Sequence, residues 1–217
     1  MFDAELFQIT RLSLQISAIA TAVSLLIGLP LGTVLGLGKF PGRGLLLSLV
    51  NTGMGLPPVV VGLLVAMMLW RSGPLGELRL IYTPTAIIIA QTVISAPVVT
   101  GLTAAALQAL DPRLRLQLYG LGASRWQMIW ILWREARLPL LAALMAGFGS
   151  VISEVGASMM VGGNIRYQTR VLTTAIVLET SKGNFDFAIG LGVSLLLITF
   201  LINWALTWIQ QKGDGRE

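Results

Sequence analysis

Residues 111–137 read DPRLRLQLYGLGASRWQMIWILWREAR, a basic segment with five arginines. The stretch before it, residues 80–110, carries no charge, and the stretch after it, residues 138–165, carries only Glu154. This pattern is typical of a chain that crosses a lipid bilayer and gathers cations in one loop, because Lys and Arg are enriched in cytoplasmic loops. A cationic loop of this kind is also a surface on which a soluble partner could dock.

The composition extends this interpretation to all 217 residues. Apolar residues make up 55% of the chain, charged residues only 12%, and the mean hydropathy is +0.80, which leaves too few charges to cover a water-exposed surface. Several uncharged stretches are longer than the roughly 20 residues with which a helix crosses a bilayer. We predict an all-α integral membrane protein, one transmembrane domain over residues 1–217, with five transmembrane helices. Their predicted positions are residues 12–37, 45–69, 84–108, 138–161 and 188–209.

The distribution of the 15 Lys and Arg residues predicts the orientation. If the 111–137 loop is cytoplasmic, most of the cations lie inside, as the positive-inside rule requires. The N-terminus is then outside and the C-terminus inside. The inner cations are Lys39, Arg43, Arg113, Arg115, Arg125, Arg134, Arg137, Lys212 and Arg216, and the outer ones are Arg11, Arg71, Arg79, Arg166, Arg170 and Lys182.

The missing residue types exclude several kinds of chemistry. The chain has no Cys and no His, which argues against thiol redox chemistry, zinc sites and a Ser–His nucleophile. It also lacks a G-x-x-x-x-G-K-[ST] phosphate loop, so any ATP must be bound by another chain. We therefore expect no enzymatic activity, cofactor or metal here. A secondary carrier and a membrane-embedded enzyme are the alternatives from other classes, but a single ionisable residue, Glu154, offers no ion-coupling pair.

Small and polar residues predict how the helices meet. Gly28, Gly32 and Gly36 form a small-xxx-small ridge suited to close helix packing. Glycines and prolines at residues 53–62 predict a bent or broken second span. The polar stripe of the third span is consistent with both interhelical hydrogen bonding and pore lining. Our candidates for the pore and its gate are Thr92, Ser95, Ser150, Ser153, Glu154 and Ser158.

Glu154 is an ionisable residue toward the outer end of the fourth span, which makes it a candidate functional residue. The alternative is a structural carboxylate that accepts hydrogen bonds from backbone N–H or Ser groups. Beyond it, residues 162–187 form an outer segment, in which apolar residues at helical spacing predict a short amphipathic helix near 169–181 at the membrane interface. Residues 184–186 are expected to form the turn before the last span. This segment is either a partner surface or a solvated connector.

Two blocks of the sequence resemble a known family. Gly122, Ala123, Ser124 and Trp126 match the G-A-S-x-W core of the cytoplasmic coupling segment in permeases of binding-protein-dependent ABC importers, although residues 116–118 read LQL where that pattern has E-A-A. SEVGASMMVGGNI at 153–165, followed by TR at 169–170, resembles the molybdate, sulfate and tungstate branch, and tungstate-type permeases most. The matching residues of this second block are Gly156, Ala157, Asn164 and Arg170.

The resemblance implies a type I ABC importer permease that carries a tetrahedral oxyanion, tungstate in the first place, with molybdate or sulfate as the alternative. It implies a homodimer with the pore on its two-fold axis, two ATPase subunits that bind ATP and Mg²⁺, and an outer solute-binding protein, in the inner membrane of a prokaryote. It also implies alternating access driven through a coupling helix near 114–124; the alternative for this loop is a positive anchor at the headgroups. The residues expected to couple to the ATPase are Leu114, Leu118, Tyr119, Gly122, Ala123, Ser124 and Arg125.

Overall fold

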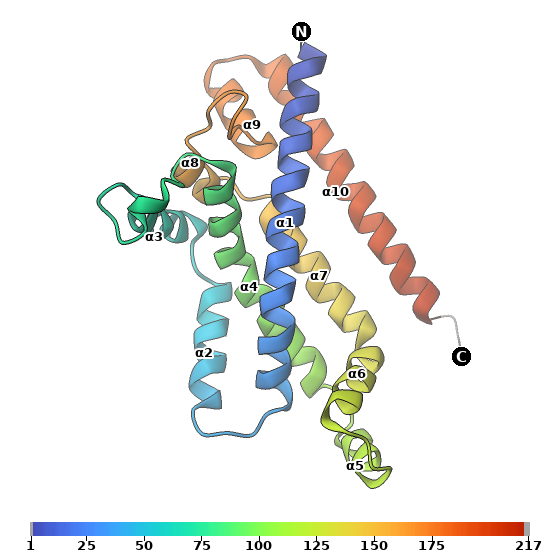
Figure 1. The fold of residues 1–217 in the computed structure, drawn as a ribbon. Coiled ribbons are helices and arrows are strands. Elements are labelled where there is room, and N and C mark those ends of the chain that lie inside the picture. Colours follow the sequence, from blue (N-terminus) through green and yellow to red (C-terminus); the bar gives the residue numbers. More distant parts are fainter. Residues whose placement is uncertain (1, 215–217) are drawn as a thin grey trace.

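The computed structural model describes residues 2–214, and within that range it contains helices and connecting loops but no strand (Figure 1). Arg216, counted above among the inner cations, lies outside the described residues. The elements are α1 (Phe2–Leu37), α2 (Arg43–Met54), α3 (Pro58–Leu69), the 3-10 helix η1 (Gly76–Leu78), α4 (Pro84–Gln108), α5 (Pro112–Gly120), α6 (Arg125–Glu135), α7 (Arg137–Ile152), α8 (Gly156–Gly162), α9 (Leu172–Ser181) and α10 (Phe185–Asp214).

Three segments are helices long and apolar enough to cross a membrane: Ala4–Leu37, Pro84–Gln108 and Phe185–Gln211. Two further crossings are possible if each of two bent helix pairs counts as one span. The pair α2 and α3 bends by 101°, and the pair α6 and α7 bends by 74°. The described chain therefore has three candidate spans, or up to five, and the predicted number of five stays a prediction.

The prediction of a broken second span is confirmed. The helix ends at Met54 and resumes at Pro58, because Pro57 and Pro58 cannot donate the backbone hydrogen bonds that a continuous helix needs. The prediction of a continuous fourth span over 138–161 is wrong, since α7 ends at Ile152 and the separate helix α8 starts at Gly156. Glu154 lies in this second break.

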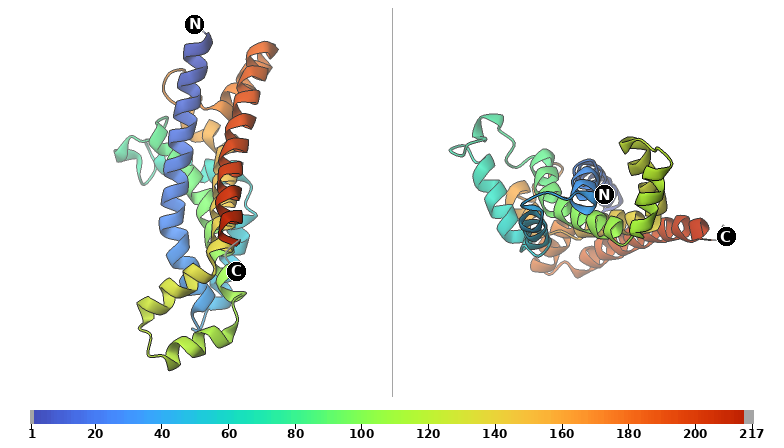
Figure 2. Two further views of the ribbon diagram at one scale, coloured as in Figure 1. Left: turned by 90° about the vertical axis from the view of Figure 1, so that its right-hand side faces the viewer. Right: turned by 90° about the horizontal axis from the view of Figure 1, so that it is seen from below.

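The long helices run along one axis of the molecule, with the N-terminus at one end and the α5–α6 hairpin at the other (Figures 1 and 2). We call these the N-terminal end and the loop end. Helix α10 begins near the N-terminal end and descends toward the loop end, so the first and last described helices start at the same end. The hairpin extends beyond the bundle, as the view from below shows (Figure 2).

The glycine ridge of α1 packs directly on α4, as the sequence predicts. A Cβ atom on Gly28 would lie 2.7 Å from the Val99 side chain, and one on Gly32 would lie 2.6 Å from the carbonyl oxygen of Thr100. The contact continues at Gly36, where a Cβ would lie 3.0 Å from the Ala104 carbonyl oxygen. These glycines therefore let the two backbones approach closely, and their role is packing.

The predicted amphipathic helix exists as α9, with one face buried in the protein and the other exposed. Leu172 and Ala175 are fully buried, together with Thr173, Thr174 and Glu179, and the apolar part of this set packs with residues of α1 and α10. Helix α9 thus packs on α1 and α10 through its buried face, while Val177, Thr180 and Ser181 are exposed, and its predicted place at the membrane interface stays a prediction. The predicted turn at 184–186 is wrong, because α10 already begins at Phe185.

Candidate functional site

The loop end is built by local capping signals in the sequence. Asp111 caps α5 by accepting a hydrogen bond from Arg113 N at 2.8 Å, and Pro112 occupies the first helical position. Ser124 and Gln127 form a reciprocal capping box at the start of α6. Gly122 lies between the helices with φ +75°, a conformation that favours glycine, and so it forms the turn of the hairpin. The first helix spans 112–120, so its predicted range of 114–124 is shifted.

One side of the hairpin is an internal core. Leu118 is only 8% exposed and clusters with Leu107, Met128 and Leu132, while Leu114 and Ala123 pack against the cluster. These side chains hold α5 against α6; Leu118 is buried, and Leu114 and Ala123 are partly buried, so their predicted contact with an ATPase stays a prediction. Ser124 is exposed but serves as the α6 cap. The apolar spacing of the segment could not indicate which face would be internal.

The other side of the hairpin is open. Leu116 is 70% exposed, Leu121 is 84% exposed, and Tyr119 and Arg125 are also exposed. We define these four residues as the tip surface. Sequence reasoning identified Tyr119 and Arg125 but missed Leu116 and Leu121, whose apolar side chains at the end of a polar hairpin are typical of a docking surface.

Polar side chains tie the hairpin to the end of α1. Arg115 Nη2 donates to the carbonyl oxygen of Leu37 at 3.0 Å, and the Trp133 indole N–H donates to Thr33 Oγ1 at 2.9 Å. Arg43, at the start of α2, likewise donates to the Leu35 carbonyl oxygen at 2.7 Å. The last carbonyl groups of a helix lack partners within the helix, and cations there are favourable. The hairpin is therefore hydrogen-bonded to α1 and is followed directly in the chain by α7.

Side chains form hydrogen bonds with the backbone groups at the break between α7 and α8. Glu154 is buried, and its Oε1 accepts a hydrogen bond from Ala157 N at 2.7 Å, while the Thr173 hydroxyl donates to the Glu154 carbonyl oxygen at 2.8 Å. Gln91 of α4 donates through Nε2 to the Val151 carbonyl oxygen at 3.3 Å. Irregular backbone at membrane depth requires such partners. The geometry is that of the structural carboxylate considered for Glu154.

The remaining pore candidates divide into two groups. Thr92, Ser95 and Ser158 are buried within the protein, so in this conformation they line no pathway. Ser95 donates to the Gly147 carbonyl oxygen at 3.2 Å, and Ser158 accepts from Gln91 Nε2 at 3.4 Å. Both are interhelical hydrogen bonds, which is the alternative to pore lining. Ser150 is partly exposed and Ser153 is exposed, although both hydroxyls donate to carbonyl groups of α7. These two remain candidates for a gate.

We expect Glu154→Gln to be mild and Glu154→Leu to be destabilising. Glutamine keeps an oxygen that can accept the hydrogen bond of Ala157 N, whereas leucine leaves that buried N–H without a partner. Losing the bond should cost about 1–2 kcal/mol. Thermal unfolding of the three proteins in the same detergent measures this order. A Glu154→Gln variant that unfolds normally but does not transport would show instead that the charge itself is required.

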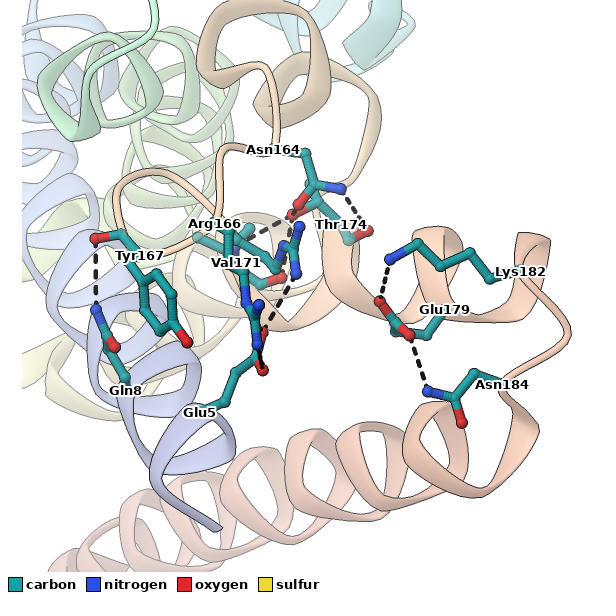
Figure 3. Close-up of polar contacts among 11 residues, drawn as sticks. Glu5, Gln8, Asn164, Arg166, Tyr167, Val171, Thr174, Glu179, Lys182 and Asn184 are labelled. Carbon is teal, nitrogen blue, oxygen red and sulfur yellow. Dashed lines mark hydrogen bonds and ion pairs between the residues drawn. The ribbon is translucent and has the colours of Figure 1, made fainter. Parts of the chain in front are cut away.

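A polar cluster closes the N-terminal end (Figure 3). The Glu5 carboxylate forms a bidentate ion pair with Arg166, whose Nε lies 2.9 Å from Glu5 Oε1, and a second ion pair with Arg170 at 3.3 Å. The cluster therefore joins the start of α1 to the loop before α9. Nearby, a hydrogen bond from Lys182 lowers the pKa of the Glu179 carboxyl against the effect of burial, and a bond from Asn184 lowers that pKa further.

The residues of the second sequence block build this end of the molecule. Gly156 and Ala157 start α8, and a Cβ on Gly62 would lie 2.5 Å from the Ala157 Cα, so α8 packs closely on α3. Asn164 has φ +51°; its amide nitrogen donates to the Thr174 carbonyl oxygen, and its Oδ1 accepts from the Thr174 hydroxyl. Arg170 pairs with Glu5. Sequence reasoning missed Glu5 because its partners are some 160 positions away, at separations of 161 and 165.

Comparisons with known proteins agree with this architecture. Residues 28–214 match the family model described as binding-protein-dependent transport system inner membrane component. The probable anion ABC transporter permease of Haloferax volcanii is 41% identical over 98% of this chain and 94% of its own. The tungstate uptake system permease of Peptoclostridium acidaminophilum is 39% identical over 97% of this chain and 92% of its own. An inward-facing structure of the MetNI methionine ABC transporter shares the fold, with a TM-score of 0.78 and 20% identity over 96% of this chain and 95% of that one.

Proposed function

The chain belongs to the family of binding-protein-dependent transport system inner membrane components, and on that premise we propose that it is the permease subunit of an ATP-driven importer of a tetrahedral oxyanion. Tungstate is the proposed substrate, supported by the 39% identity to a tungstate uptake permease. Molybdate or sulfate is the alternative within the same class. The observation that carries the proposal is the α5–α6 hairpin, whose exposed tip surface offers a partner subunit a place to bind.

The partner at the tip surface is the ATPase, which binds ATP and Mg²⁺, because this chain has no phosphate-binding loop. Its closure would push on the tip surface and move the rigid hairpin. The hydrogen bonds from Arg115 to Leu37 and from Trp133 to Thr33 would carry the motion to α1, and α7 follows α6 directly. Rigid-body motion of this kind alternates the access of a pathway between two sides.

A homodimer with the pathway at its centre is supported by the break between α2 and α3. Helix α2 has no buried residue, and Asn51, Thr52 and the non-helical residues 55–57 are exposed in the single chain. Lipid tolerates no unpaired irregular backbone, which must be buried in protein or line a water-filled cavity. A second copy that covers α2 and α3 meets both conditions, with polar groups of the break facing the pathway.

The orientation that fits this assembly places the loop end in the cytoplasm and the N-terminal end outside, in the inner membrane of a prokaryote. The cationic hairpin is then on the side that the positive-inside rule favours. The ion-paired cluster of Glu5, Arg166 and Arg170, together with α9, forms the outer end, where the solute-binding protein would deliver the anion.

The function is tested by reconstitution of the permease with its ATPase subunit and binding protein in liposomes. We expect tungstate to stimulate ATP hydrolysis and to accumulate inside only when both partners and ATP are present. Stimulation by molybdate or sulfate at lower concentration would select the alternative substrate. Anion flux that needs no nucleotide would contradict the importer and favour a secondary carrier.

The isolated permease should bind tungstate no more tightly than about millimolar, because a transported ion must be held weakly enough to leave. Two outer arginines, Arg166 and Arg170, are both ion-paired with Glu5, so a dianion that binds them must compete with that carboxylate. Calorimetric titration of the detergent-solubilised protein without its binding protein checks this. A micromolar site would contradict the prediction, and its loss in Arg166→Gln would locate it.

A further inference from the structure

Helix α6 has a second exposed face, distinct from the tip surface. Trp126 is 82% exposed and Trp130 is 68% exposed, and their i,i+4 spacing places them on one stripe, which Arg134 continues. The opposite face of the helix is buried through Met128 and Leu132. We call Trp126, Trp130 and Arg134 the indole stripe. Two large aromatic side chains exposed side by side on one helix require an environment other than bulk water.

The depth of this stripe is set by the third tryptophan of the helix. Trp133 is hydrogen-bonded to Thr33, which lies four residues before the end of α1 at Leu37, or about 6 Å along the helix axis. Trp130 precedes Trp133 by three residues, so along the helix it lies at most about 4.5 Å nearer the loop end than Trp133 does. For Trp126 the limit is about 10 Å, and both limits hold for any tilt of α6. Both indoles therefore lie within a turn or so of the level at which the α1 span ends.

We place the boundary between the hydrocarbon and the headgroups at this level, where the α1 span ends. Tryptophan is enriched there because its ring is apolar and its N–H is polar. The 74° bend between α6 and α7 turns α6 away from the direction of the spanning helix, as an interfacial helix requires. Arg125 and Arg134 are exposed on α6 against one acidic residue, Glu135, which favours anionic headgroups.

We propose that the indole stripe binds the headgroup layer of the bilayer, with anionic phospholipid as its partner. Helix α5 lies farther from the bundle than α6 does (Figures 1 and 2), so the ATPase contacts the hairpin mainly through α5 and the lipid contacts it through α6, with Arg125 adjoining both surfaces. The stripe holds α6 at a constant depth while α5 is displaced, which makes α6 the pivot of the hairpin. This inference stands whether or not tungstate is the transported anion.

Quenching of tryptophan fluorescence by brominated lipids tests the proposal. The permease is reconstituted in nanodiscs of phosphatidylcholine and phosphatidylglycerol with bromine near the headgroup end of the chains, and wild-type emission is compared with that of Trp126→Phe/Trp130→Phe. The emission lost in the double variant is the signal of the stripe. We expect most of this signal to be quenched by the lipid, with or without the ATPase subunit bound. A signal that brominated lipid does not quench, or one that the ATPase shields from the lipid, would overturn the proposal.

A second measurement covers the case in which the double variant does not fold. The chain has no cysteine, so Trp126→Cys can be labelled with a nitroxide at one site, with Tyr119→Cys on the tip surface as the matched control. We expect the label at position 126 to be accessible to oxygen from the bilayer, and the label at 119 only to a water-soluble nickel complex. Equal exposure of both labels to the nickel complex would contradict the proposal. Loss of oxygen access at 126 when phosphatidylglycerol is omitted would show that the anionic headgroup is the partner, and the same access in phosphatidylcholine alone would contradict that part.

Discussion

Replacing Gly122 with valine is expected to abolish ATP-driven uptake while the transmembrane bundle remains folded. Gly122 has φ +75°, where a β-branched residue is strongly disfavoured, and no atom lies within 4 Å of the position that a Cβ would take. The change therefore meets no steric conflict and acts through the backbone, at a cost of about 1–2 kcal/mol or more. The turn relieves this strain by changing its shape, which reorients α5 and the tip surface relative to α6. Uptake and ATPase binding in proteoliposomes measure the effect.

Two matched variants separate this effect from a general loss of stability. Gly122→Asn should retain much of the uptake, because asparagine adopts positive φ more readily than other residues. Gly120→Ala adds a methyl group at an equally open position of α5 with a helical backbone, and it should be neutral. Normal uptake in Gly122→Val, with a normal yield of the assembled complex, would refute a coupling role for this turn.

Replacing Gly32 with leucine is expected to prevent stable folding. A Cβ at this position would lie 2.6 Å from both the Thr100 carbonyl oxygen and the Thr103 Cβ, so α1 and α4 must separate to admit any side chain. Even Gly32→Ala should lower the free energy of unfolding by about 1–3 kcal/mol, the usual range for overpacking. The protein cannot repack locally, because the nearest atoms belong to backbone and to short branched side chains. Thermal unfolding in nanodiscs and the yield of monodisperse protein measure the loss.

The control for this prediction is Gly190→Ala in α10, where no atom lies within 4 Å of the added methyl group. That variant should be neutral or slightly stabilising, since alanine favours a helix more than glycine does. The comparison thus separates the effect of close packing at the glycine ridge from the effect of replacing any glycine in a helix. Equal stability of Gly32→Ala and Gly190→Ala would mean that the close α1–α4 contact does not contribute to folding.

Some features were predictable because they depend on short stretches of sequence. Hydropathy identified the apolar helices, and the caps at Asp111 and Ser124 and the left-handed turn at Gly122 use neighbouring residues alone. The glycine ridge was also recognised, since three glycines at spacing four permit close packing on any partner. Whether these helices give five crossings remains a prediction, because the two bent pairs can be counted in two ways.

Other features depended on contacts between distant parts of the chain. The sequence by itself determined that the chain is a membrane protein, that its second span is broken, and which loop is cationic, because these features depend on the local composition of the chain. Only the tertiary structure decided that Leu118 faces inward, that Glu154 accepts a hydrogen bond from Ala157 N while Thr173 donates to its carbonyl oxygen, and that Glu5 pairs with Arg166. A helix in lipid presents similar side chains all around, so the face that packs is chosen by the partner helix and not by its own sequence.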